Sequence, residues 1–207
     1  MASAWIAVPL SLMAGNTIKP VDYLNYARRD LIEDDDRALV NALGNIKRAI
    51  DCQLDVLLEI YGLLRGSMKQ HWLFPKKIEI IQKIGVVSPN ILKTINTERV
   101  KLEHFHKKPV KNEVITAADI AELFIELYKN KISRIELLIN YDDDFAFWMD
   151  TEQNVIRIFD NTKLLLQCGD IEMFKETIDE KKLKPIQEIP ISDLDSWTEA
   201  CARYIRI

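Results

Sequence analysis

Apolar residues recur at every third or fourth position through most of residues 1–139, and this spacing predicts a bundle of helices. The clearest helix covers residues 37–61, where one broad apolar stripe precedes Gly62, and glycine commonly follows a helix end. Residues 65–75 are largely polar and contain a glycine and a proline, so we expect a loop there. Further helices are expected over residues 20–33, 76–84, 89–105 and 116–138.

The pattern changes near Asn140. Residues 145–160 predict two short strands around a polar turn, because apolar and polar positions alternate there. A third strand is expected over residues 164–169, a short helix after Asp170, and a terminal helix capped by Ser192. We therefore expect a mainly α protein, with a helical domain over residues 1–139 and a small α+β region over residues 140–207. No flexible linker separates the two parts, so they should pack together.

The first 19 residues are apolar, but they do not read as a signal sequence or a membrane span. No Lys or Arg precedes Lys19, Pro9 interrupts the run, and the run is too short to cross a bilayer. We expect an arm that packs on the body or on a second subunit, and no membrane partner. The cysteines are widely spaced and odd in number, which indicates reduced thiols in a cytoplasmic protein: Cys52, Cys168 and Cys201.

The charged residues are distributed unevenly along the chain. The chain carries a net charge of −4, so it is not a basic nucleic-acid binder as a whole. Residues 99–111, however, hold five cations against Glu103, a local net charge of +4. Such a cluster suits phosphate, because lysines make mobile contacts and arginine can grip two oxygens at once: Arg99, Lys101, Lys107, Lys108 and Lys111.

Arg99 lies in line with the apolar stripe of its expected helix, so it should face a cleft, an interface or a carboxylate. At about 100° per residue, His106 lies within about 20° of Arg99. His104 lies about 140° away from it. His104 can reach the same space only if the helix unwinds near Pro109 or if two copies of the chain face each other.

These residue types can support RNA cleavage without a metal ion. Near neutral pH a histidine can take the proton of a ribose 2′-hydroxyl or give one to the leaving oxygen. Arginine can stabilise charge on the phosphate. A zinc site is not expected, because His104 and His106 lack partnering ligands. A cationic helix end is also favoured by the helix dipole alone, so a solvated helix terminus remains the simpler alternative.

Residues 20–139 resemble the HEPN superfamily of small helical bundles, many of which are toxin or defence ribonucleases. The hallmark of that family is Arg, four to six residues, then His, late in a helix and ahead of a final helix. Here the matching segments are "RVKLEH" from Arg99 to His104 and "RVKLEHFH" to His106. Active members often carry a polar residue directly after the arginine, whereas this chain has Val100.

The resemblance implies a homodimer in which two motifs meet at a shared cleft. It implies Arg99 as the phosphate stabiliser and His104 as the acid or base, with His106 as the second candidate. The expected function is a metal-independent endoribonuclease, as a defence or toxin–antitoxin component with an antitoxin partner. The alternative is a non-catalytic module of the same fold that binds RNA, a nucleotide or a protein.

The other signals are weaker. Two runs of three aspartates, 34–36 and 142–144, are expected to be a helix end and a solvated turn. Asp51 and Arg48 could orient the site or form an exposed salt bridge. His71 should be a surface or packed histidine, and the aromatic residues of 145–148 should be core. No cofactor is expected, because no glycine-rich phosphate loop, nucleophile elbow or dinucleotide fingerprint occurs.

Overall fold

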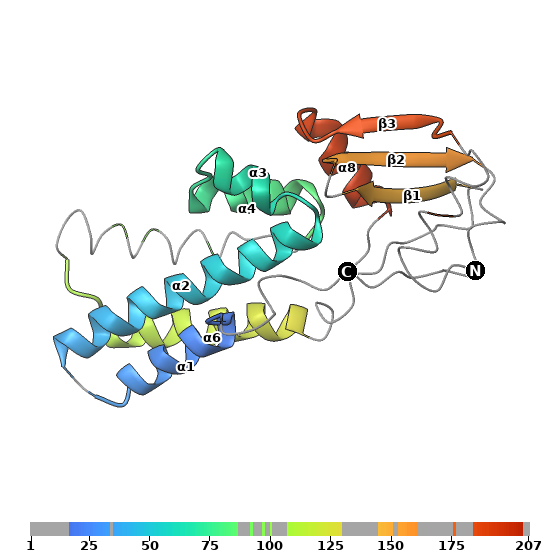
Figure 1. Cartoon of the computed structure of the whole chain (residues 1–207). Coiled ribbons are helices and arrows are strands. Elements are labelled where there is room, and N and C mark those ends of the chain that lie inside the picture. The colour runs from blue at the N-terminus through green and yellow to red at the C-terminus, as the bar shows by residue number, and fades with distance from the viewer. Residues whose placement is uncertain are drawn as a thin grey trace.

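The protein is mainly helical and carries a small antiparallel sheet, which confirms the coarse fold class (Figure 1). The computed structural model describes residues 17–33, 35–86, 107–129, 145–150, 153–160 and 184–204, with Leu92, Thr97, Val100 and Glu176. Its helices are α1 (Pro20–Asp30), α2 (Asp36–Ile60), α3 (Leu64–Lys69), α4 (Phe74–Lys83), α6 (Lys111–Lys129) and α8 (Leu194–Tyr204). Its strands are β1 (Phe145–Asp150), β2 (Val155–Asp160) and β3 (Gln187–Pro190).

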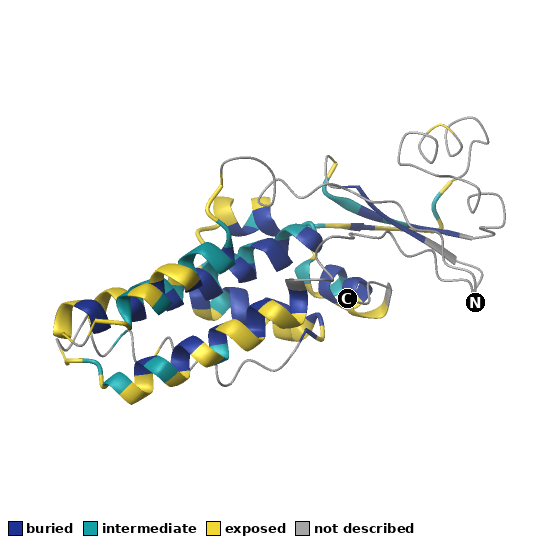
Figure 2. Ribbon diagram, turned by 90° about the horizontal axis from the view of Figure 1, so that it is seen from below, coloured by how far each residue is buried: buried dark blue, intermediate teal, exposed yellow. Residues whose placement is uncertain are grey.

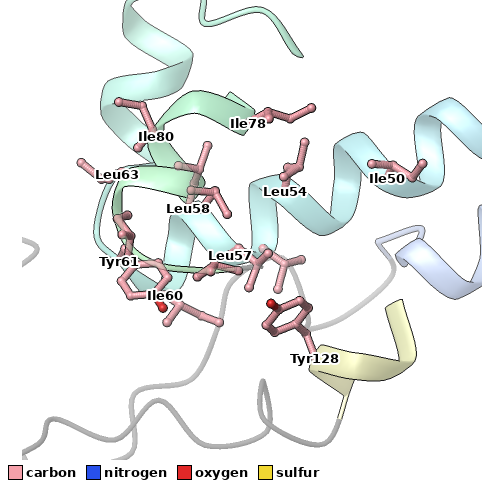
Figure 3. Close-up of a cluster of buried hydrophobic side chains, with 14 of the residues drawn as sticks. Ile50, Leu54, Leu57, Leu58, Ile60, Tyr61, Leu63, Ile78, Ile80 and Tyr128 are labelled. Atoms are coloured by element: carbon pink, nitrogen blue, oxygen red, sulfur yellow. The ribbon is translucent and has the colours of Figure 1, made fainter. Parts of the chain in front are cut away.

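Helix α2 is the axis of the molecule. Helices α1 and α6 lie along one side of it, while α3 and α4 lie on the other side of its C-terminal half (Figure 1). In Figure 2 the helices carry buried residues on the faces that they turn toward one another. The predicted apolar stripe is that inner face, since Ile46, Ile50 and Leu57 are fully buried. Around the C-terminal half of α2, side chains from α2, α4 and α6 meet in one cluster (Figure 3).

Aspartates shape the turn between α1 and α2. The carboxylate of Asp35 accepts a hydrogen bond of 2.7 Å from the backbone N–H of Ala38 and so caps α2. Arg28 of α1 reaches α6, where its guanidinium donates to Asp119 at 2.7 Å and to Glu122 at 2.5 Å. The first aspartate run was expected to be a helix end, and the described part of it, Asp35 and Asp36, caps and begins α2; Asp34 lies outside the described residues.

Two helical predictions were wrong. Residues 64–69 form α3 inside the predicted loop, because Leu64 and Ser67 are buried there and the helix tolerates Gly66. Helix α6 begins at Lys111 rather than at Thr116. The hydroxyl of Thr116 donates to the carbonyl oxygen of Asn112 four residues earlier, which is a contact inside a helix and not a cap.

The C-terminal region contains a hairpin, as predicted, and a strand that was not. β1 pairs antiparallel with β2, and β2 pairs with β3, which gives the order β1-β2-β3. The alternation of apolar and polar residues over 187–190 is too short to predict a strand. These residues form β3 because they pair with β2. The terminal helix α8 is capped by Asp193 rather than by Ser192, since the Asp193 carboxylate accepts from the N–H of Ser196 at 3.2 Å.

The helical part and the sheet region pack together where α2 ends. The indole N–H of Trp197 donates to the buried carbonyl oxygen of Tyr61 at 3.0 Å. Gly62, with φ of 69°, leaves room there for Met149 and Trp197. This contact shows that the two parts pack against each other, as expected.

Several predictions fall on residues that the structure does not describe. These are the N-terminal arm over 1–16, the boundary near Asn140, the aspartates 142–144, the strand over 164–169, the helix after Asp170, and Cys168.

Candidate functional site

The cationic segment that follows the predicted motif is exposed. Lys107 and Lys108 are both exposed and non-helical, and Lys111, which begins α6, is half-buried. Three residues upstream have helical backbone. Leu92 is buried, Thr97 is exposed and Val100 is half-buried. The remaining predicted site residues lie outside the described residues: Arg99, Lys101, His104 and His106.

A shallow hollow opens beside this segment, against the first two turns of α6. Its floor is apolar and its edge is charged, with one acid, Glu113, among the lysines. The lining residues are Leu43, Lys107, Lys108, Pro109, Glu113, Val114 and Ala117. The hollow thus brings two of the four predicted phosphate-binding lysines to one place, next in sequence to His106.

One of these lysines already has an acidic neighbour. The Lys108 ammonium forms an ion pair with Asp36, the first residue of α2, 72 positions earlier in the chain. Both side chains are largely exposed, so the pair contributes little to stability. A phosphate that binds at Lys108 has to compete with this carboxylate.

A second charged cluster lies between α2 and α4. Lys77 is 8% exposed, and its ammonium lies 3.0 Å from Asp51 and 2.6 Å from Asp55. Lys47 lies 3.4 Å from Asp51 on the opposite carboxylate oxygen. Asp51 therefore belongs to a half-buried ion-pair network, while Arg48 donates to Asn45 on its own helix. Asp51 thus forms salt bridges, but they are half-buried and their partners are Lys77 and Lys47 rather than Arg48.

Burial and pairing act against each other in this cluster. Burial raises the pKa of Asp55 and Lys77 lowers it, and the net direction is upward, so Asp55 takes up a proton more readily than an ordinary aspartate. Burial also lowers the pKa of Lys77, but Asp55 and Asp51 outweigh it and the pKa is raised. The two carboxylates keep the Lys77 ammonium protonated, as expected for an ion pair with a structural role. Sequence inspection missed the cluster, although Lys77 does lie on the apolar face of α4 between Phe74 and Ile81.

The cysteines do not supply a nucleophile within the described chain. Cys52 is half-buried, and burial together with Asp55 and Asp51 raises the pKa of its thiol to about 11. Cys201 is buried, which also raises its pKa. Both are free thiols, as expected. In the ranges that the structure covers, no three His, Cys, Asp or Glu side chains group together as metal ligands.

The other residues noted in the sequence occupy ordinary structural positions. Trp148 is buried beneath Arg157, whose guanidinium lies 5.1 Å from the indole ring and donates to Asp150 at 2.9 Å and Glu188 at 2.8 Å. Trp148 is therefore core, as expected, and presents no surface on which a base could stack. His71 is exposed in the turn between α3 and α4. Among the described helices, none has the length and apolar character to traverse a bilayer.

Comparisons of the chain with protein-family models, with curated proteins and with solved structures give no match. The class is therefore defined by the fold itself: a mainly helical protein with a small three-stranded antiparallel sheet.

Proposed function

We propose that this protein is a HEPN-like, metal-independent ribonuclease that acts through Arg99 and the histidines His104 and His106. The observation that carries the proposal is the Arg-x4-His and Arg-x6-His spacing at the junction of two helices. Val100 still has helical backbone, residues 107–110 do not, and α6 begins at Lys111. If the expected helix continues through the motif, the motif falls late in one helix and ahead of another, as in the family that it resembles.

The proposal assigns Arg99 to the inward side of its expected helix, by extrapolation from Leu92. Leu92 is 3% exposed, and a residue seven positions later on a continuous helix lies within about 20° of it. Arg99 is that residue. An arginine on a buried line needs an anionic partner, because leaving it unpaired there is costly. In the proposed site that partner is the phosphate of the substrate.

The proposed chemistry is transfer of the phosphoryl group to the neighbouring ribose oxygen. One histidine takes the proton of the 2′-hydroxyl, whose oxygen then attacks the adjacent phosphorus. The bond from phosphorus to the 5′-oxygen breaks, and that oxygen receives a proton from the second histidine, which is in its protonated form. Arg99 stabilises the charge that develops on the phosphate, and Lys107 and Lys108 hold the flanking phosphates. A second copy of the chain is the proposed source of the second motif.

The test is cleavage of a mixed-sequence RNA in EDTA by the wild type and by Arg99→Ala, His104→Asn and His106→Asn. Losing the catalytic histidine should lower the rate by about 100-fold or more. His71→Asn is the matched control, because His71 is exposed at φ of 53° and asparagine tolerates that backbone. Cleavage that survives all three substitutions would contradict the site.

A binding module without catalysis is the second candidate, and Val100 favours it. Val100 is a half-buried aliphatic residue where active members of the family often carry a polar one. RNA bound with an affinity that depends on Arg99 and Lys107, but not cleaved, would favour the module. In either case Asp36→Asn should strengthen RNA binding several-fold at low salt, because it removes the carboxylate that competes for Lys108.

A further inference from the structure

The corner between α3 and α4 is cationic and apolar on its outer face. Residues 64–76 contain three Lys or Arg and no acidic residue, in a chain whose net charge is −4. The next lysine, Lys77, is buried against Asp51 and Asp55 and does not belong to this face. Arg65, Met68 and Lys69 are exposed on one side of α3, because their spacing of three and four places them together. Leu64 and Ser67 are buried on the other side.

Two large aliphatic side chains project from this corner. Met68 is 65% exposed and Leu73 is 76% exposed, and they lie only five residues apart. Between them Trp72 is half-buried, and its indole N–H donates to the side-chain oxygen of Gln70 at 3.0 Å. The outer face therefore offers flexible aliphatic chains at its tip and not an open aromatic ring.

The cations around this tip are available to a partner. In the part of the chain that the structure describes, Arg65 and Lys69 form no ion pair, whereas Lys76 pairs with Glu79 at 3.0 Å. α3 and α4 lie on the side of α2 away from α1 and α6, and the hollow at Lys107 and Lys108 adjoins the opposite, N-terminal half of α2 (Figure 1). The corner is thus separate from the hollow at Lys107 and Lys108.

We infer that this corner docks on the surface of an anionic lipid bilayer. A bilayer of this kind has negative phosphates directly above an apolar layer, which matches cations that surround exposed aliphatic side chains. RNA offers no apolar layer for Met68 and Leu73, and an acidic peptide needs a groove rather than a projecting corner. Docking at the surface needs no spanning segment, so it is compatible with the finding that no described helix could span a bilayer, and it departs from the expectation of no membrane partner.

The experiment is co-sedimentation of the full chain with vesicles. One set is phosphatidylcholine alone, and the other contains phosphatidylserine as about a third of the lipid. The wild type should bind the second set, bind the first only weakly, and lose binding as salt rises. Leu73→Ser should weaken binding about tenfold. Lys69→Gln should weaken it about fivefold.

Matched controls lie elsewhere on the surface. Leu123→Ser removes an equally exposed leucine, 72% exposed on α6, and Lys184→Gln removes another exposed lysine. Both should bind as the wild type does. Leu73→Ser should fold, because Leu73 is the N-cap position of α4 and serine is favoured there.

Three results would overturn the inference. The first is equal vesicle binding by Leu73→Ser and Leu123→Ser. The second is no binding of the wild type to either set of vesicles. The third is binding of an RNA oligonucleotide or an acidic peptide that Leu73→Ser abolishes, with no binding to vesicles. Because the readout is vesicle binding, its failure leaves the RNA cleavage assay unaffected.

Discussion

Gly62 follows the C-terminal end of α2, where α2 meets both the sheet and α8. Two constraints require a glycine at this position. Its φ of 69° lies in the left-handed region, which costs other residues about 1–2 kcal/mol. A Cβ atom at this position would also lie 2.6 Å from the sulfur of Met149 and 3.2 Å from Cζ2 of Trp197. The first constraint is local, and the second comes from residues far away in the sequence.

A pair of substitutions separates the two constraints. Gly62→Ala should lower the free energy of unfolding by about 3 kcal/mol, because strain and overpacking add. Gly85→Ala is the control, since Gly85 has φ of 88° but nothing within 4 Å of the added Cβ, and it should cost only about 1 kcal/mol. Urea denaturation measures both. Equal losses would show that Met149 moves aside at no cost.

At the scale of elements, Lys77 joins α4 to α2. Its ammonium is buried between two carboxylates of α2, whereas the neighbouring Lys76 is more exposed and pairs within its own helix. Lys77→Met keeps most of the side-chain volume but leaves Asp51 and Asp55 facing each other. Thermal or urea unfolding at neutral pH should show a loss of about 3 kcal/mol, against less than about 1 kcal/mol for Lys76→Met.

The same pair predicts a pH dependence. The pKa of Asp55 is raised, so its charge costs stability above that pKa and the cost disappears as the pH falls through it. In Lys77→Met this cost is larger, because the cation that pairs directly with Asp55 is gone and only the more distant Lys47 remains. The difference in unfolding free energy between wild type and Lys77→Met should therefore shrink as the pH falls from 7 toward about 4. A constant difference over that range would mean that the loss comes from packing and not from charge.

At the scale of the whole molecule, the helical part and the sheet region form one packed body. Trp197 is fully buried and donates to Tyr61, and Lys83 of α4 lies 2.9 Å from Asp195 of α8. We expect one cooperative transition, with helix loss by circular dichroism and tryptophan fluorescence changing at the same urea concentration.

Trp197→Phe tests that connection. It leaves the buried Tyr61 carbonyl without its donor and opens a small cavity, so it should cost about 2–3 kcal/mol and still unfold in one step. Trp72→Phe is the control, because Trp72 is half-buried and its indole N–H donates to the exposed Gln70. Two separate transitions in the wild type would show that the sheet region unfolds independently.

Elements whose pattern is strong and local could be predicted from the sequence. Periodicity predicts helix α2 and the hairpin of β1 and β2. Residues that commonly begin or end helices predict the start of α1 at Pro20 and the end of α2 just before Gly62. The Arg-x4-His spacing and the +4 cluster are likewise properties of the sequence, and the ribonuclease proposal depends on them.

Only the tertiary structure decided the features that join distant segments. α3 exists because Leu64 and Ser67 are buried, although the segment has the composition of a loop. β3 exists because β2 pairs with it. Asp36 pairs with Lys108, which lies 72 positions later in the chain. Lys77 pairs with Asp51 and Asp55, which lie up to 26 positions earlier. A periodic pattern shows which face of a helix is buried, but not which element covers it. Partners of buried or paired charges therefore depend on packing that no local pattern contains.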